Sequence, residues 1–170
     1  MFDNKVINEL KDLLIGKQET VAVAESVTSG FIQGSLSTAE NASEFFEGGI
    51  STYNLEQKVR HLNVNREHAE KVDCVSEQVS NEMALNCAKL FNATWALAIT
   101  GYASPVPQGN NKLFAHYAVA KNGQIMDHQY IESTCEPGLQ TQLYFTNRAL
   151  QKLLELLKNE EAPTAGAGIQ

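Results

Sequence analysis

The stretch Val21–Gly30 (VAVAESVTSG) constrains the fold of this chain more than any other. Its four small or β-branched apolar residues run directly into a hydroxyl-rich turn that ends in a glycine. A short, unbroken apolar run is typical of a strand that is buried on both faces. The apolar residues that follow have helical spacing: Phe31, Ile32 and Leu36. We therefore predict a buried strand that ends at the N-terminus of a helix, as in open α/β sheets.

The turn after this strand is the first candidate site. It places a carboxylate and three hydroxyls at the carboxyl end of the strand: Glu25, Ser26, Thr28 and Ser29, followed by Gly30. Ligands of open α/β sheets bind at this edge, and a helix N-terminus offers free N–H groups to an anion or an oxyanion. The alternative is structural, because Ser and Thr are common helix caps. From the local sequence, both interpretations stay open.

The rest of the chain continues the pattern of strands and helices. A first helix ends near Gly16. Further strands are predicted over 47–53, 95–101, 113–120 and 124–131, and further helices over 54–62, 75–91 and 139–158. Asn122-Gly123 between the last two strands is a strong hairpin signal, so these strands are antiparallel. Two prolines in the segment 102–112 predict an irregular loop.

This order predicts an α/β fold, a three-layer α/β/α sandwich. Its mixed sheet has about five strands, of which one is antiparallel and comes from the C-terminal hairpin. The strand ends that carry Ser26, Tyr53 and Thr100 then meet on one rim. We expect one domain over residues 1–158, because 170 residues with 43% hydrophobic content suit a single core. Residues 159–170 have little apolar mass, and we expect a disordered tail.

Charge and composition limit the partners. A net charge of −7 without clustered Lys or Arg argues against nucleic acid, and the chain has neither a signal-peptide pattern nor a membrane span. We expect a cytoplasmic protein. The three cysteines and four histidines lack metal-ligand spacing, so we predict no metal site and no disulfide framework.

Several ordered motifs resemble one known family, the C-terminal domain of the competence/damage-inducible protein CinA, which also occurs alone as nicotinamide mononucleotide amidohydrolase. Residues 24–30 (AESVTSG) resemble the family's AESCTGG, and residues 46–53 with Glu56 and Lys58 resemble FERGFVTYSNEAK. Residues 75–77 and 99–101 match its AVSEEV and ITGIAGP blocks. The resemblance spans most of the chain, and the family's three-layer sandwich agrees with the predicted fold.

The resemblance implies hydrolysis of a carboxamide, nicotinamide mononucleotide or a related small-molecule amide, without a cofactor. The positions that match the family assign Ser26 as nucleophile, Lys58 as its base and Tyr53 as a proton relay or donor. Backbone N–H groups near Thr28 to Gly30 would hold the oxyanion. The predicted substrate-binding residues are Glu25, Thr28, Ser29, Gly30, Thr100 and Gly101.

Departures from the family pattern leave a second hypothesis open. Residues 101–107 (GYASPVP) place bulk where the family has glycine, so we expect this loop to narrow the pocket. The family's GDR segment has no counterpart, and Glu132–Leu143 contains no Lys or Arg, so a phosphate would miss a cation. The alternative to an amidohydrolase is a catalytically degenerate ligand-binding or assembly module. Assembly into a homo-oligomer also stays open.

Overall fold

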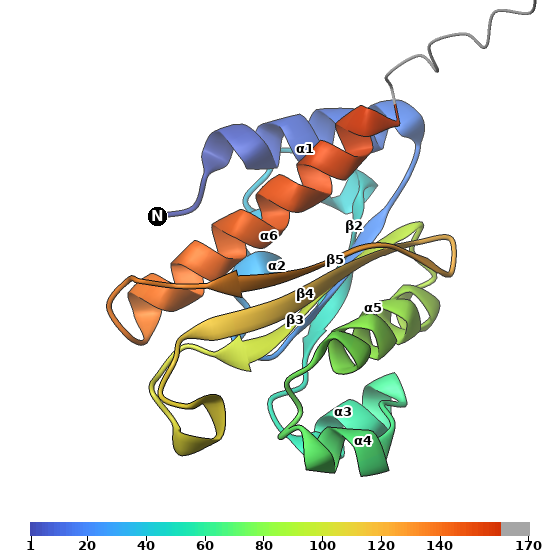
Figure 1. Cartoon of the computed structure of the whole chain (residues 1–170). Coiled ribbons are helices and arrows are strands. Elements are labelled where there is room, and N and C mark those ends of the chain that lie inside the picture. Colours follow the sequence, from blue (N-terminus) through green and yellow to red (C-terminus); the bar gives the residue numbers. More distant parts are fainter. Residues whose placement is uncertain (161–170) are drawn as a thin grey trace, which may run out of the picture.

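The computed structural model describes residues 1–160 and forms three layers, with a five-stranded sheet between two groups of helices (Figure 1). The strands are β1 (Val21–Glu25), β2 (Phe46–Ser51), β3 (Trp95–Tyr102), β4 (Phe114–Lys121) and β5 (Gln124–Glu132). The helices are α1 (Asn4–Lys17), α2 (Phe31–Ser37), α3 (Leu55–Leu62), α4 (Arg66–Lys71), α5 (Glu77–Phe91) and α6 (Leu139–Asn159), with short 3₁₀ turns η1 (Ala42–Glu44) and η2 (Pro107–Gly109).

The sheet is mixed, in the order β2-β1-β3-β4-β5. Strand β1 pairs parallel with β2 and β3, while β4 is antiparallel to both of its neighbours. The turn between β4 and β5 has positive φ at Asn122 (49°) and Gly123 (79°), the backbone that a tight hairpin requires. The predicted fold class, with its single antiparallel strand, is confirmed.

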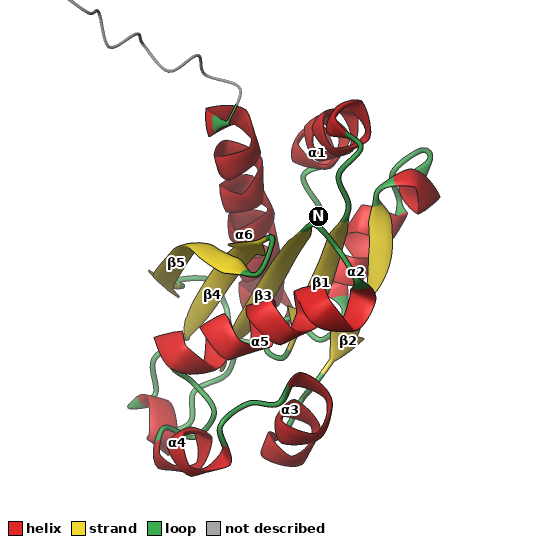
Figure 2. Cartoon of the chain, turned by 90° about the vertical axis from the view of Figure 1, so that its right-hand side faces the viewer, coloured by secondary structure: helices red, strands yellow, loops and turns green. Residues whose placement is uncertain are grey.

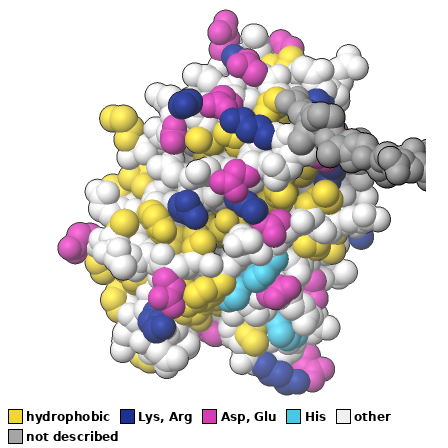
Figure 3. Space-filling model, turned by 45° about the horizontal axis from the view of Figure 1, so that its top comes forward, with side chains coloured by type: hydrophobic (Ala, Val, Ile, Leu, Met, Phe, Trp, Pro, Cys, Tyr) yellow, Lys and Arg dark blue, Asp and Glu magenta, His cyan; other side chains and the backbone are white. Residues whose placement is uncertain are grey.

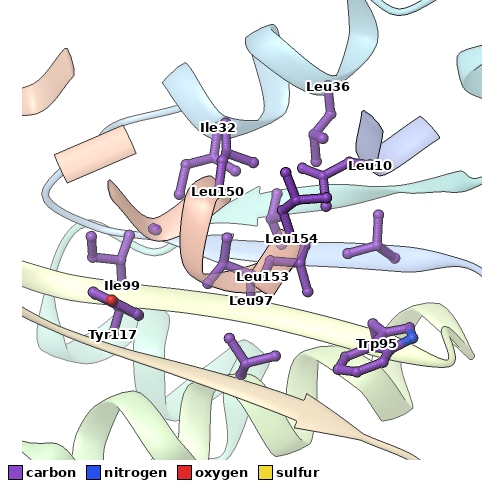
Figure 4. Close-up of a cluster of buried hydrophobic side chains, with 14 of the residues drawn as sticks. Leu10, Ile32, Leu36, Trp95, Leu97, Ile99, Tyr117, Leu150, Leu153 and Leu154 are labelled. Atoms are coloured by element: carbon purple, nitrogen blue, oxygen red, sulfur yellow. The ribbon is translucent and has the colours of Figure 1, made fainter. Parts of the chain in front are cut away.

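The two faces of the sheet carry side chains of very different size. On one face, large residues of the central strands pack against α1, α2 and α6; this cluster includes Leu10, Ile32, Trp95, Leu97, Ile99, Tyr117 and Leu153 (Figure 4). The opposite face is almost entirely alanine: Ala22, Ala24, Ala96, Ala98, Ala118 and Ala120. Helix α5 lies across this second face (Figure 2). Alanines allow this helix to approach the sheet closely.

Some predicted boundaries are wrong. Strand β2 ends at Ser51, so Tyr53 lies in the connection to α3 rather than in a strand. Helix α4 was not predicted, although Asn65 caps it by accepting from the N–H of His68 (2.9 Å). The predicted tail began two residues too early, because α6 includes Asn159 and the Glu160 carboxylate accepts hydrogen bonds from Lys121 (2.7 and 2.8 Å). The remainder of that tail, 161–170, lies outside the described residues.

Charged side chains of both signs intermix over the described part of the face shown in Figure 3. Several are paired there and elsewhere; for example, Lys152 lies 3.1 Å from Asp127. Within residues 1–160, no helix is long and apolar enough to cross a bilayer. The expectations that neither nucleic acid nor membrane is a partner remain predictions.

Candidate active site

The turn after β1 is built around the carboxylate of Glu25, which is fully buried. This carboxylate accepts hydrogen bonds from the backbone N–H groups of Gly30 (3.0 Å), Ile32 (3.1 Å) and Gln33 (2.8 Å), and from the Thr28 hydroxyl (2.5 Å). The first turn of α2 is therefore capped by a side chain that precedes it in the strand. The anion position at this helix N-terminus, where we expected a ligand, is filled by the protein's own carboxylate.

Ser26 follows on the opposite side of the chain and faces a cavity. Its backbone N–H donates to the carbonyl of Ile99 (3.0 Å), which ties the turn to β3. Its hydroxyl Oγ lies 2.8 Å from Nζ of Lys58, and the side chain is 7% exposed. The structural alternative, in which Ser26 and Thr28 cap α2, is wrong, because Glu25 accepts the N–H bonds that these caps would take.

Lys58 reaches Ser26 from α3, a short helix that begins after Asn54. The Asn54 side chain accepts from the N–H of Gln57 (3.0 Å) and so fixes the start of α3. The Lys58 side chain is 1% exposed, and its Nζ also donates to the carbonyl of Thr52 (2.8 Å).

Burial lowers the pKa of Lys58 to about 8, although the nearby Cys74 and Asp73 partly oppose this shift. The Lys58 amine therefore has a much larger neutral fraction near neutral pH than an ordinary lysine.

The cavity in front of this pair has a volume of about 420 Å³. It is lined by the ends of β1 and β3, the start of α3, the segment before α5 and the loop after β3. The lining residues are Ser26, Val27, Tyr53, Asn54, Leu55, Lys58, Asp73, Cys74, Val75, Thr100, Gly101, Tyr102, Ala103, Ser104, Val106, Gly138 and Gln142. Ser26, Tyr53, Lys58 and Thr100 thus meet in one cavity. The loop after β3 forms one wall, where we expected it to narrow the pocket.

Three predicted residues of this cavity have contacts that differ from the roles we expected. Tyr53 is 71% exposed and makes no side-chain hydrogen bond within residues 1–160, so it does not contact the Ser26–Lys58 pair as a relay would. The hydroxyl of Thr100 donates to the carbonyl of Cys74 (2.8 Å). A Cβ on Gly101 would lie 2.2 Å from the carbonyl oxygen of Phe114, so this glycine is required by the neighbouring strand β4.

The other predicted binding residues lie outside the cavity lining. Glu25 and Thr28 are fully buried within the turn, and the N–H of Gly30 is taken by Glu25. The N–H and the hydroxyl of Ser29 both contact the carbonyl of Ser26 (3.2 Å each). The oxyanion donors that we expected at Ser29 and Gly30 are thus already engaged. The backbone N–H groups of Val27 and Thr28 have no hydrogen-bond partner among the described residues.

Sequence reasoning missed part of the lining. Asp73 and Cys74 precede the matched VSE block, and both have positive φ (49° and 62°). Gln142 of α6 lines the cavity and donates to the carbonyl of Val27 (2.9 Å). A polar residue in a long helix gives no signal of such a contact. Within the described residues, no group of three or more His, Cys, Asp or Glu side chains is placed to hold a metal ion.

Comparisons with known proteins agree with this arrangement. The chain matches the CinA C-terminal domain model over residues 3–157. A CinA-like protein of a Picosynechococcus species is 33% identical over 122 residues, which are 70% of this chain and 29% of that protein. A CinA-like protein of Prochlorococcus marinus is 38% identical over 111 residues, which are 65% of this chain and 26% of that protein. The chain thus spans less than a third of the length of these curated relatives.

Solved structures show the same likeness. The crystal structure of a CinA superfamily protein from Klebsiella pneumoniae superposes with a TM-score of 0.86 at 26% identity, covering 91% of this chain and 97% of that one. A competence or damage-inducible protein from Enterobacter asburiae gives a TM-score of 0.82 at 26% identity, covering 92% and 99%. Together, the five-stranded sheet, the Ser26–Lys58 pair and these matches show that the chain belongs to the CinA C-terminal domain family.

Proposed function

We propose that this protein is an amidohydrolase that converts a small carboxamide to a carboxylate and ammonia, with Ser26 as nucleophile and Lys58 as base. The observation that carries this proposal is the 2.8 Å contact between the Ser26 hydroxyl and the buried Lys58 amine, whose pKa is lowered to about 8. The family resemblance suggests nicotinamide mononucleotide or a related amide as substrate. The proposed reaction needs no cofactor, because a serine–lysine pair supplies its own base.

The reaction begins with Lys58 in its neutral form. Its lone pair accepts the proton of the Ser26 hydroxyl while Oγ attacks the amide carbon, and the carbonyl oxygen becomes an oxyanion. The Thr52 carbonyl, which accepts a hydrogen bond from Nζ, holds the amine so that it faces Ser26. The N–H group of Val27, which lines the cavity and has no hydrogen-bond partner among the described residues, is the donor best suited to the oxyanion.

Collapse of this intermediate breaks the C–N bond. The Lys58 ammonium returns the proton to the departing nitrogen, so ammonia leaves and Ser26 carries an acyl ester. Water then attacks the ester, Lys58 takes one proton of that water and passes it to Oγ, and the product leaves as a carboxylic acid, which gives its proton to ammonia in solution. The sum is amide plus water to carboxylate plus ammonium, with Ser26 and Lys58 restored.

A binding or assembly module without catalysis is the second candidate, and the exposed Tyr53 favours it. A relay residue in a working site should contact the nucleophile or its base, whereas Tyr53 makes no such hydrogen bond within residues 1–160. If this candidate is correct, the Ser26–Lys58 pair persists without turnover.

Ammonia release separates the two candidates. The wild-type protein is assayed with nicotinamide mononucleotide and nicotinamide riboside, alongside Ser26→Ala and Lys58→Met. Matched controls are Ser37→Ala, which removes an exposed hydroxyl from α2, and Lys71→Met, which removes an exposed ammonium from α4.

We expect each active-site variant to lose about 10³-fold or more in kcat, the double variant to be little worse, and both controls to match the wild type. Unchanged ammonia release by Ser26→Ala would end the serine–lysine proposal. Absence of release from the wild type with both compounds would favour the binding module.

A further inference from the structure

Asp73 is the second charged group of the cavity, and neither the mechanism nor the family motifs account for it. It lies between α4 and α5, and its carboxylate accepts a hydrogen bond from the hydroxyl of Tyr102 (2.7 Å). It is also close enough to Lys58 to raise the pKa of that amine against the effect of burial. Its Oδ1 oxygen accepts no hydrogen bond within residues 1–160 and is free to meet a ligand.

The backbone holds Asp73 in place at some cost. Asp73 and Cys74 are consecutive non-glycine residues with positive φ, a conformation that L-residues rarely adopt in pairs. Two contacts fix this segment: the N–H of Cys74 donates to the carbonyl of Ala69 (2.8 Å), and its carbonyl accepts from Thr100 (2.8 Å). Strain of this kind concentrates at ligand sites.

The charge of the cavity is unfavourable for a phosphate. Of the acidic and basic residues, only Lys58 and Asp73 belong to the described lining. The Lys58 amine is already engaged by Ser26 and the Thr52 carbonyl, and in the neutral form that reacts it carries no charge. Above the Lys58 pKa of about 8, the Asp73 carboxylate therefore remains as the single formal charge among these lining residues, and it is negative.

No other Lys or Arg of residues 1–160 lines the cavity. Arg66 of α4 pairs with Glu56 (2.6 Å), and Lys112 pairs with Glu132 (3.1 Å), and neither cation lines the cavity. The remaining residues 161–170 contain no Lys or Arg.

We propose that the cavity selects a carboxamide on a cationic ring that carries no phosphate, and that Asp73 is the residue that recognises the positive ring. This inference rests on the proposed function for the position of the amide beside Ser26. Asp73 supplies the opposite charge, and two tyrosines, Tyr53 and Tyr102, belong to the same lining; aromatic rings of this kind can hold a cation. The exposed ring of Tyr53 thereby gains a role in binding.

The test measures binding in the Ser26→Ala protein at a pH above the Lys58 pKa of about 8, so that neither turnover nor the Lys58 ammonium interferes. Isothermal titration compares two pairs of compounds: 1-methylnicotinamide with nicotinamide, which differ in ring charge, and nicotinamide riboside with nicotinamide mononucleotide, which differ by one phosphate. We expect the cationic compound and the compound without phosphate to bind about three- to tenfold more tightly than their partners, since Asp73 is partly screened by solvent.

Asp73→Asn isolates the carboxylate, because asparagine tolerates the left-handed backbone and still offers an acceptor to Tyr102. It should reduce both ratios, and the tyrosines that remain account for any preference for the cation that is left. Glu47→Gln, an exposed carboxylate of β2 outside the cavity, should leave both ratios unchanged. Raising the salt concentration should lower both ratios in the protein that retains Asp73 and should not lower them in Asp73→Asn.

Tighter binding of the mononucleotide, ratios that do not change in Asp73→Asn, or no binding of any of the four compounds would each overturn the inference. The outcomes also separate it from the proposed function. Selective binding without ammonia release from the wild type refutes the amidohydrolase and leaves the ligand class standing. Ammonia release that favours the mononucleotide refutes the ligand class and leaves the amidohydrolase standing.

Discussion

The buried Lys58 makes the stability of this protein depend on pH in a predictable direction. Its pKa falls from 10.5, the ordinary value of an exposed lysine, to about 8 in the folded protein, chiefly because burial disfavours the charged form. Between these two values the unfolded chain binds the proton and the folded protein does not. Since stability rises with pH wherever the unfolded state binds more protons, the free energy of unfolding should rise from pH 8 to pH 10.5 on this account.

The size of the effect follows from the shift in pKa. A difference of about 2.5 units at about 1.36 kcal/mol each corresponds to about 3 kcal/mol. Below pH 8 the Lys58 ammonium is present in both the folded and the unfolded state, so the folded protein bears the full free-energy cost of burying it. Tyrosines and cysteines also titrate in this range, and burial raises the pKa of Tyr117 and Cys87 to about 12, which acts with the opposite sign.

Subtracting the free energy of unfolding of a Lys58 variant from that of the wild type cancels the contributions of these tyrosines and cysteines. Urea unfolding of the wild type and of Lys58→Met is followed by fluorescence of Trp95, the one tryptophan of the chain, which is fully buried. The wild type minus the variant should gain about 3 kcal/mol between pH 8 and pH 10.5. Lys71→Met, at an exposed position on α4, should show no such gain. If the difference stays constant or falls with pH, Lys58 is not a buried base of lowered pKa.

Three further predictions concern the same site. The kcat/KM for amide hydrolysis should rise about tenfold per unit below pH 8 and level off above it, since the base acts when neutral; a flat pH profile would contradict this. Glu25→Gln should lower the free energy of unfolding by about 3 kcal/mol, because three N–H groups and a hydroxyl lose a charged acceptor, whereas Glu47→Gln should change it little in the same urea assay. Gly101→Ala should lower the free energy of unfolding by about 3 kcal/mol, because its Cβ would meet the backbone of β4. Gly34→Ala, in open space on α2, should instead raise it by about 0.5–1 kcal/mol. Equal effects of the two substitutions in thermal unfolding would refute the packing argument.

The fold was predictable because several local signals agree. The apolar run of β1, the Asn122-Gly123 turn and the helical spacing of α6 each specify one element, and a mixed sheet is the arrangement that joins them. The predicted helix over 75–91 is present as α5, and Ser76 caps it by accepting from the N–H of Val79 (3.2 Å). Helix α4 was missed because its six residues show no apolar period.

The contacts of the candidate site were less predictable, because they depend on where side chains point. Family motifs identified Ser26 and Lys58 as candidates, and their 2.8 Å contact depends on the position of α3, which packs against α5 and α4. By contrast, the motif alone suggests that Glu25 binds a ligand. Only the folded structure shows that its carboxylate accepts the backbone N–H groups at the start of α2. Asp73 belongs to none of the family motifs. Its position follows from the left-handed backbone conformation of Asp73 and Cys74.

The neighbouring residues Glu25 and Ser26 have different roles in the turn, because Glu25 stabilises its structure while Ser26 faces the cavity. Successive residues of a strand point to opposite sides, so the carboxylate enters the helix layer while the hydroxyl enters the cavity. Because Glu25 occupies the N-terminus of α2, that end is closed to any external anion, including a phosphate. The N–H group of Val27, which has no partner among residues 1–160, lies before the helix, within the same turn as Ser26. Such a turn would stabilise charge that develops beside Ser26 under the proposed mechanism, and it offers little to a charge that a ligand already carries, which agrees with the proposed carboxamide ligand without phosphate.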